Sequence, residues 1–184
     1  TKVRQIISLG ARIIYYDRQT EDREQIANAL LVDASVALIK PYDDWHTIAG
    51  QGTCGAEIQT QVPGELDSVI VCAGGGGLAA GVGTYLRSHQ PRLRIYTAEP
   101  EDWADHQQSF AAGRRIALTA TTPTLCDGLM AREPGALTFA INTLNHTQGL
   151  SAPDSRVVTA MRLVWQHLGL RLEPSGAIGV ACLL

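Results

Sequence analysis

The sequence predicts an α/β fold in which helices cover a parallel sheet. Short runs of β-branched and apolar residues alternate along the chain with longer stretches in which apolar residues recur at helical spacing. Repeated strand–helix units of this length favour parallel strands, because a helical crossover returns the chain to the same sheet. A run of four glycines also stands directly between one expected strand and the next helix, where parallel-sheet proteins bind ligands.

The N-terminal part of the chain alternates helix and strand patterns. We expect a helix, a strand, an amphipathic helix and a second strand at residues 1–9, 12–16, 21–32 and 36–39. The segment Pro41-Tyr42-Asp43-Asp44 then interrupts the pattern. We therefore expect a domain boundary there, with residues 1–44 in one domain and residues 45–184 in another.

The rest of the chain continues the alternation. We expect a helix around 53–62, a strand at 68–73, a helix at 78–88, a strand at 94–98 and a late helix at 155–168. One side of the late helix is apolar and is expected to lie in the core: Val158, Met161, Val164, Trp165 and Leu168. Pro174 is typical of a first helical position, so one more helix is expected to begin there.

The glycine run, Gly74, Gly75, Gly76 and Gly77, is followed by Leu78 at the expected helix start. A backbone without Cβ atoms can adopt positive φ and bring its N–H groups close to a ligand, and the helix N-terminus adds a positive dipole. The backbone N–H groups of these five residues are therefore predicted to hold a phosphate. A β-branched residue in place of Gly75 or Gly76 is predicted to abolish binding with little effect on the rest of the fold.

Two other interpretations of the glycine run stay open at this point. It could mark only a tight turn and close helix packing. It could also belong to a dinucleotide site, since Gly75, Gly77 and Ala80 match the G-x-G-x-x-A spacing and Glu99 ends the next strand, where an acid could bind a ribose.

Five short segments follow one another in a characteristic order: Gly50-Gln51-Gly52-Thr53 with Glu57, Gly74 to Gly77, Glu99-Pro100, Thr124-Leu125-Cys126-Asp127-Gly128, and Glu173-Pro174-Ser175-Gly176-Ala177. In that order the chain resembles the serine/threonine dehydratase and serine racemase family of pyridoxal-phosphate enzymes, the fold-type II group, over nearly its whole length. The resemblance implies a parallel-sheet α/β fold of the tryptophan synthase β type. The chain would hold part of the small mobile domain and a large cofactor-binding domain that is incomplete at its C-terminus.

The resemblance also implies a reaction. A deaminating dehydratase would convert a β-hydroxy amino acid of the threonine, serine or hydroxyaspartate type into a 2-oxo acid and ammonia, and racemisation is a second outcome of the same carbanion. Family members carry the cofactor on a lysine in a Ser-x-Lys-x-Arg-Gly type motif. This sequence contains only Lys2 and Lys40, neither in that context, so no catalytic residue is assigned and the lysine segment is expected to precede it. A non-catalytic phosphate-binding module is the alternative for a chain complete as given.

The resemblance further implies a cation site. Glu99, the backbone carbonyl of Trp103 and Asp105 fall at positions that bind Mg²⁺ or Ca²⁺ in serine racemase-like members, and oxygen ligands suit these ions. The alternative is that Glu99 accepts hydrogen bonds from loop amides and Asp105 caps a helix.

Two further acids are implied to lie near the cofactor. Asp127 is expected to order a loop on the substrate side of the pocket, or else to serve only a structural turn. Glu173 is expected beside the cofactor ring, or else as the cap of the helix that begins at Pro174.

Composition excludes several classes of protein. The 184 residues include 15 Lys and Arg against 18 Asp and Glu, and the net charge of −3 argues against a nucleic acid or an anionic membrane as the main partner. The four cysteines are scattered and indicate neither a disulfide framework nor a zinc site. We expect a cytoplasmic protein with a small amino-acid substrate, and the resemblance implies a homodimer.

Overall fold

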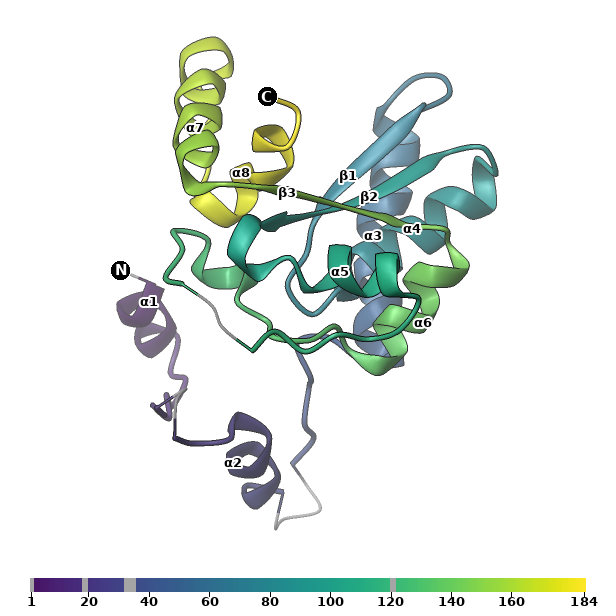
Figure 1. Cartoon of the computed structure of the whole chain (residues 1–184). Helices are drawn as coiled ribbons and strands as arrows, with labels where there is room; N and C mark the ends of the chain where they lie inside the picture. Colours follow the sequence, from purple (N-terminus) through teal and green to yellow (C-terminus); the bar gives the residue numbers. More distant parts are fainter. Residues whose placement is uncertain (1, 18–19, 32–35, 120–121) are drawn as a thin grey trace. The chain divides into compact units, whose positions relative to one another are not determined.

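The computed structural model of the chain describes residues 2–17, 20–31, 36–119 and 122–184 (Figure 1). Its contacts divide it into two units, Thr1–Ile39 and Lys40–Leu184, which are considered separately below. The segment 41–44 thus belongs with the larger unit, and the assignment of residues 1–44 to a small mobile domain stays a prediction. Among the described residues, no helix has both the length and the apolar character needed to cross a membrane.

The smaller unit contains two short helices, α1 (Lys2–Ser8) and α2 (Arg23–Ala29). Both were predicted, although residue 32 at the expected end of the second lies outside the described residues. Asp22 begins α2 by accepting a hydrogen bond from the Glu24 N–H at 2.7 Å. The strands predicted at 12–16 and 36–39 are wrong, because both segments are irregular. A strand needs a neighbour for its backbone groups, and none pairs with them in the described part of this unit.

The larger unit is built on a parallel sheet, as predicted. Its strands are β1 (Ser68–Cys72), β2 (Arg94–Pro100) and β3 (Gln148–Ala152), in the order β1-β2-β3. Both pairs are parallel, with Val71 opposite Thr97 and Thr97 opposite Gly149. The first two strands occur where the β-branched runs predicted them. β3 was not predicted, because its sequence Gln-Gly-Leu-Ser-Ala contains no β-branched residue.

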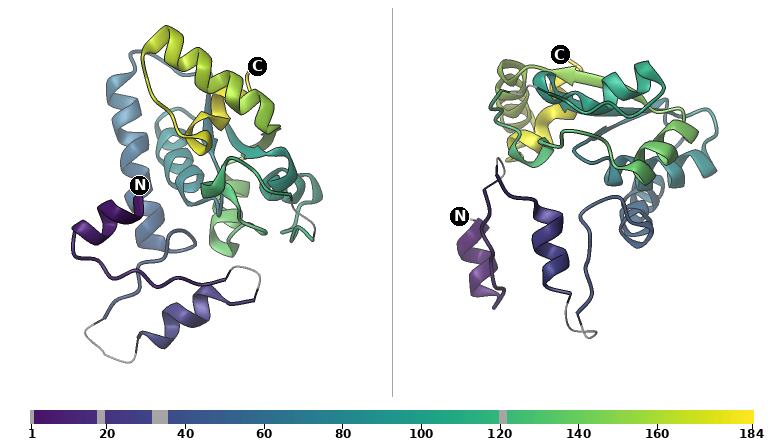
Figure 2. Two further views of the ribbon diagram at one scale, coloured as in Figure 1. Left: turned by 90° about the vertical axis from the view of Figure 1, so that its left-hand side faces the viewer. Right: turned by 60° about the horizontal axis from the view of Figure 1, so that its bottom comes forward.

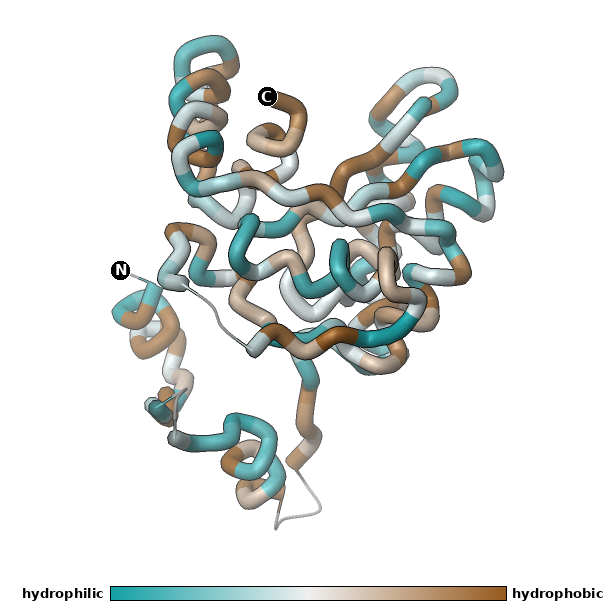
Figure 3. Tube along the Cα trace, viewed as in Figure 1, coloured by the Kyte–Doolittle hydropathy of each residue, from teal (hydrophilic) through white to brown (hydrophobic). Residues whose placement is uncertain are grey.

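Helices cover both faces of this sheet (Figures 1 and 2). They are α3 (Trp45–Gln61), α4 (Gly77–His89), α5 (Asp105–Ala112), α6 (Ala136–Leu144), α7 (Asp154–Leu168) and α8 (Pro174–Ala181). Val71 of β1 packs in one core with Val82 and Leu86 of α4, whereas Ile70 packs in a second core with Ile178 of α8. Since neighbouring side chains of a strand point to opposite faces, the two cores lie on opposite sides of the sheet. The apolar residues of β1 and α8 appear brown in Figure 3.

Close packing of α3 against α4 explains part of the Gly50-Gln51-Gly52-Thr53 segment. α3 begins earlier than predicted, because Asp44 accepts hydrogen bonds from the His46 and Thr47 N–H groups at 2.9 and 3.0 Å. A Cβ atom on Gly81 of α4 would lie only 2.6 Å from the backbone nitrogen of Gly52 in α3. These glycines therefore allow the two helix backbones to approach each other.

The inward face of α7 differs from the prediction. Val157, Ala160 and Val164 are buried, so Val164 of the predicted set is buried, and Met161 is half-buried against the same core. Trp165 and Leu168 are 50% and 66% exposed, and the prediction that they lie in the core is wrong. The guanidinium of Arg171 lies 5.2 Å from the centre of the Trp165 ring, so this ring packs against a cation at the surface.

Candidate functional site

The glycine loop, Gly74 to Gly77, connects β1 to α4. Gly76 has a φ of 89° and is the N-cap of α4, and no side chain caps the helix. The first N–H groups of an α-helix have no acceptor within the helix. The N-terminus of α4 therefore presents uncapped backbone N–H donors and the positive end of the helix dipole, which together suit an anion. Leu78 is half-buried and packs against the core shared by α4 and β1.

The neighbours of the loop leave no room for side chains at its centre. A Cβ atom on Gly75 would overlap the ring of Tyr42. One on Gly76 would lie 2.8 Å from Nε2 of His106 and 3.2 Å from Nδ2 of Asn142. The glycines are therefore required by close packing as well as by backbone conformation, so the alternative of a purely local turn is incomplete.

Three side chains hold the carbonyl groups of the glycine loop. Nε2 of His106 donates to the Gly74 carbonyl at 3.1 Å, Oγ1 of Thr138 to the Gly75 carbonyl at 2.6 Å, and Nδ2 of Asn142 to the Gly76 carbonyl at 3.2 Å. A carbonyl can only accept, so Nε2 of His106 carries the proton. Burial lowers the pKa of this histidine to about 4, which keeps the ring neutral. These contacts were not predicted.

Two residues from the segment before α3 complete the surroundings of the loop. Tyr42 covers Gly75 and also lies next to Gly77, whose Cβ position is 3.1 Å from the Tyr42 Cβ. Oδ1 of Asp43 accepts hydrogen bonds from the Leu137 and Thr138 N–H groups at 2.7 and 3.2 Å, and so caps α6. This segment therefore connects the glycine loop to the start of α6.

Glu99 and Asp105 form a buried acidic pair behind the end of β2. The two carboxylate oxygens of Glu99 accept from the His106 and Gln107 N–H groups, both at 2.8 Å. Loss of hydration raises the pKa of both acids, that of Asp105 to about 7, and the charge of Asp105 further raises the pKa of Glu99. Both oxygens of Asp105 are buried without a hydrogen-bond partner in the described part of the chain.

The structure bears on the two interpretations of this pair. Glu99 does accept from loop amides, as the structural alternative states, but Asp105 does not cap a helix, since the N-cap of α5 is Ala104 and makes no side-chain cap bond. Trp103 is buried and its Nε1 donates to the Thr122 carbonyl at 2.8 Å. Among the described residues, no group of three His, Cys, Asp or Glu side chains could hold a metal ion. A cation here would therefore need backbone oxygens as well as the two acids.

The Asp127 turn lies beside the glycine loop, and the start of α8 lies beside that turn. The Gly128 carbonyl is 3.2 Å from the Cβ position of Gly74, and the Gly128 N–H donates to Oγ of Ser175 in α8 at 3.2 Å. Asp127 is exposed at the start of a 3₁₀ turn, Asp127–Leu129. Three of the segments named in the sequence analysis therefore lie close together: the glycine loop, the Asp127 turn and the start of α8.

Glu173 is the N-cap residue of α8, but its side chain makes no cap hydrogen bond. Glu173 thus occupies the cap position that the structural alternative gave it, with its backbone carbonyl and not its carboxylate accepting the first helical hydrogen bonds. The Cys72 thiol at the end of β1 has its pKa raised by burial and, to a lesser extent, by the charge of Glu173. Glu173 consequently lies within electrostatic range of the end of β1, just before the glycine loop.

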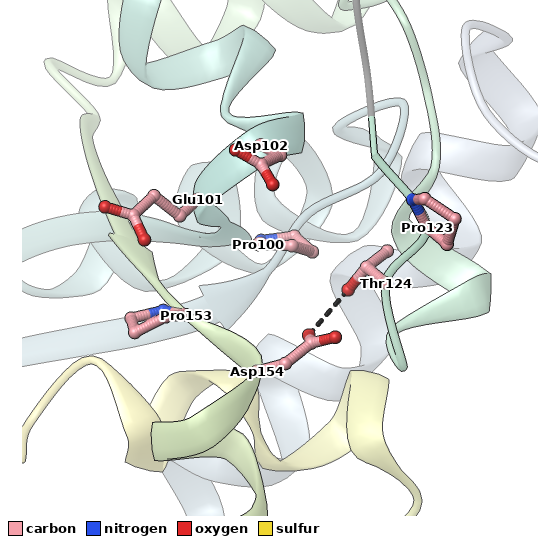
Figure 4. A pocket seen from close by; sticks show the side chains of 7 residues that line it. All are labelled: Pro100, Glu101, Asp102, Pro123, Thr124, Pro153 and Asp154. Atoms are coloured by element: carbon pink, nitrogen blue, oxygen red, sulfur yellow. Dashed lines mark hydrogen bonds between the residues drawn. The ribbon is translucent and has the colours of Figure 1, made fainter.

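A small pocket opens at the carboxyl ends of β2 and β3 (Figure 4). Its lining is Pro100, Glu101, Asp102, Pro123, Thr124, Pro153 and Asp154. Oγ1 of Thr124 donates to Oδ1 of Asp154 at 2.7 Å, shown by the dashed line in Figure 4. Three carboxylates would repel a phosphate, and no glycine of the loop lines this pocket. This pocket therefore does not suit a phosphate, and the phosphate site at the glycine loop stays a prediction.

Comparison with known proteins places this geometry in a family. A family model described as pyridoxal-phosphate dependent enzyme matches residues 1–184. The L-threo-3-hydroxyaspartate ammonia-lyase of Saccharomyces cerevisiae is 39% identical over 180 residues, which are 98% of this chain and 55% of that protein. The chain spans about half the length of the curated relatives that it matches.

Solved structures agree with this match. Maize serine racemase superposes with a TM-score of 0.90 and 37% identity, over 98% of this chain and 56% of that one. The threonine deaminase of T.th. superposes with a TM-score of 0.88 and 33% identity, over 95% of this chain and 57% of that one. The fold is thus that of the fold-type II pyridoxal-phosphate enzymes, as predicted.

The nicotinamide interpretation of Gly75, Gly77, Ala80 and Glu99 is not retained. Both oxygens of Glu99 already accept from backbone N–H groups, and Glu99 is fully buried, so it could not bind a ribose. The parallel sheet, the glycine loop at the start of α4 and the match along the whole sequence agree with one another. The chain belongs to the family of pyridoxal-phosphate dependent enzymes, among relatives that include hydroxyaspartate ammonia-lyases and serine racemases.

Proposed function

We propose that the protein is a pyridoxal-phosphate dependent dehydratase that deaminates a β-hydroxy amino acid to a 2-oxo acid and ammonia. The observation that carries this proposal is the uncapped start of α4 at the glycine loop, where close neighbours exclude a side chain at Gly75 and Gly76. That arrangement suits a phosphate held by backbone N–H groups alone.

The residues of this chain would bind and orient the cofactor. Gly74 to Gly77 and Leu78 would hold its phosphate, and no lysine or arginine occurs in this segment. Asp127 would order the loop on the substrate side, and Glu173 would lie beside the ring. When bound, pyridoxal phosphate supplies an electron sink for the carbanion left after loss of the α-proton. Neither Lys2 nor Lys40 is assigned a role in proton transfer.

The substrate class follows from the similarity to two kinds of relative. The matched lyase is named for L-threo-3-hydroxyaspartate and the superposed deaminase for threonine, and both substrates carry a hydroxyl on the β-carbon. We therefore propose a β-hydroxy amino acid of the threonine, serine or hydroxyaspartate type. A racemase is the second candidate, supported by the similarity to maize serine racemase.

We also propose a Mg²⁺ or Ca²⁺ site at Glu99, Asp105 and the carbonyl of Trp103. Two buried acids with raised pKa values, one of them with both oxygens unpartnered in the described part of the chain, form an oxygen-rich place that lacks positive charge. A hard divalent cation would supply that charge and would favour the ionised acids. Added Mg²⁺ or Ca²⁺ is therefore expected to raise the melting temperature more at pH 8 than at pH 5.5, and not in Asp105→Asn.

The activity is tested with purified protein supplied with pyridoxal phosphate. L-threo-3-hydroxyaspartate, L-serine and L-threonine are offered separately, and the 2-oxo acid, ammonia and D-amino acid are measured. A dehydratase gives 2-oxo acid and ammonia in equal amounts. D-serine without ammonia would replace this proposal by the racemase. Cofactor binding without any turnover would favour a non-catalytic module.

A further inference from the structure

Three buried polar side chains behind the glycine loop have no role in the function proposed above. His106, Thr138 and Asn142 are each 0% exposed. Burying a polar group costs free energy unless it finds a hydrogen-bond partner. Each donates a hydrogen bond to the same short stretch of backbone, the carbonyls of Gly74, Gly75 and Gly76, whereas Nδ1 of His106 and Oδ1 of Asn142 have no partner in the described part of the chain.

The three side chains form a shared support from two helices. Thr138 and Asn142 are four positions apart on α6 and therefore lie on one face of that helix. His106 comes from α5 and also lies against Gly76, next to Asn142. We call these three side chains the loop support. They contact the loop on the side of α5 and α6.

The direction of the carbonyls decides the direction of the N–H groups. In a trans peptide, the C=O of one residue and the N–H of the next point in opposite directions, and the described part of the chain has no cis peptide bond. With the carbonyls of Gly74, Gly75 and Gly76 directed at the loop support, the N–H groups of Gly75, Gly76 and Gly77 must point away from it. Three consecutive donors then face one side of the loop.

We propose that His106, Thr138 and Asn142 are positioning residues for the phosphate of pyridoxal phosphate, acting through the carbonyls that they hold. This inference rests on the proposed function, because it takes the glycine loop as the phosphate site. The loop support fixes the donors of Gly75, Gly76 and Gly77 in their binding direction before the ligand arrives, so that less order has to be imposed on binding.

Two of the carbonyls have a second donor, which makes the proposal testable by substitution. The Gly135 N–H also donates to the Gly75 carbonyl at 3.3 Å, and the Ala80 N–H to the Gly76 carbonyl at 3.0 Å. Removing the Thr138 hydroxyl or the Asn142 amide therefore leaves neither carbonyl without a partner. Because one of the two hydrogen bonds that fix each carbonyl is lost, the change should loosen the direction of the peptide groups more than it lowers the stability of the fold.

The experiment compares two probes that differ only in the phosphate, pyridoxine 5′-phosphate and pyridoxine. Neither carries an aldehyde, so their affinities do not depend on a lysine. Dissociation constants are measured for the unaltered protein, Thr138→Val and Asn142→Leu. Thr138→Ser, which keeps the hydroxyl, and His106→Gln, which keeps a donor at Nε2, are the matched controls for rescue.

The unaltered protein is expected to prefer the phosphorylated probe. Thr138→Val and Asn142→Leu should each reduce that preference about fivefold to tenfold, with pyridoxine affinity unchanged, and the two control variants should retain it. A preference that survives in Thr138→Val and Asn142→Leu would overturn the role of the loop support while leaving the phosphate site intact. No preference in the unaltered protein would instead overturn the proposed phosphate site.

A second measurement needs no variant, so it tests the direction of these N–H groups even if a substituted protein does not fold. Inorganic phosphate is titrated into isotope-labelled protein while the backbone amide resonances are followed. The amide protons of Gly75, Gly76 and Gly77 are expected to show the largest shifts. Shifts confined to other amides of the α4 N-terminus would show that these three donors do not face the phosphate, and would refute the inference.

Discussion

Gly76 combines a left-handed backbone with a closely packed environment. Its φ is 89°, and its Cβ position lies 2.8 Å from Nε2 of His106. Gly113, at the end of α5, has a φ of 64° with no atom near its Cβ position. The two glycines thus share the backbone requirement and differ in packing, which allows the two effects to be separated.

Alanine is expected to be tolerated at Gly113 and not at Gly76. Gly113→Ala should cost about 1 kcal/mol of unfolding free energy, from the positive φ alone. Gly76→Ala should cost about 2–4 kcal/mol, because overpacking is added, and should abolish cofactor binding. Urea unfolding and a pyridoxal-phosphate titration measure both. Equal losses in the two variants would contradict the packing that we describe. The prediction that a β-branched residue at Gly75 or Gly76 would have little effect on the rest of the fold is revised accordingly.

Asp105 makes the stability of the protein depend on pH. Burial raises its pKa from 3.8 to about 7, so the folded protein holds a proton that the unfolded chain releases. Stability from this group is therefore present below about pH 4 and is lost as the pH rises to about 7. The charge of Glu133 adds to this rise in the pKa of Asp105, whereas the interaction with Glu99 opposes it.

Asp105→Asn is expected to remove this pH dependence. Without added divalent cation, the variant should be more stable than the unaltered protein at pH 8, by about 3 kcal/mol, with little difference at pH 4. Asp67→Asn, at an exposed position, is the control and should leave the profile unchanged. Thermal melts across this pH range provide the test. An unaltered slope in Asp105→Asn would mean that another group carries the dependence.

The glycine loop could be predicted from the sequence, but the side chains that hold it could not. The glycine loop is contiguous, and its chemistry could be predicted from four neighbouring residues. The side chains that hold it are separated from their carbonyl partners by 32, 63 and 66 positions. Nothing in the local sequence around His106, Thr138 or Asn142 distinguishes them from surface polar residues, because their contacts arise only when α5 and α6 pack against the loop.

At the scale of elements, the predictions succeeded where the hydrophobic pattern is local. β1, α4 and β2 occur where predicted because β-branched runs and helical spacing mark them. α6 was not predicted, since its two buried positions are the polar Thr138 and Asn142. The strands predicted in the smaller unit are wrong because strand formation needs a partner, which a local pattern does not supply.

The contact between α3 and α4 gives a prediction at the same scale. Gly81 and Gly50 both lie in helices, but a Cβ atom on Gly81 would meet the backbone of α3, whereas one on Gly50 would meet nothing within 4 Å. Gly81→Ala should lower the unfolding free energy by about 1–3 kcal/mol. Gly50→Ala should raise it by up to about 1 kcal/mol, because alanine favours the helix.

Urea denaturation of the two variants measures these opposite signs. The pair controls for helix propensity, since the same substitution is made in both helices. If Gly81→Ala proved as stable as Gly50→Ala, the glycines would not be responsible for the close approach of α3 and α4.

At the scale of the whole molecule, burial is distributed unevenly along the chain. Both hydrophobic core clusters lie in Lys40–Leu184. Among the described residues of Thr1–Ile39 none is buried, and Leu9 and Ile39 are 85% and 86% exposed. Because apolar burial is the main source of folding free energy, the larger unit should account for nearly all of the stability.

A fragment of residues 40–184 is therefore expected to fold cooperatively without the smaller unit. Its melting temperature should agree with that of the full chain to within about 3 °C, because no core residue has been removed. A peptide of residues 1–39 should show little helix in water, since α1 and α2 are short helices without a buried face. Circular dichroism melts of the three species test this. A fragment 40–184 that fails to melt cooperatively would mean that residues 1–39 contribute to the core of the larger unit, and the division of the chain at Ile39 would have to be abandoned.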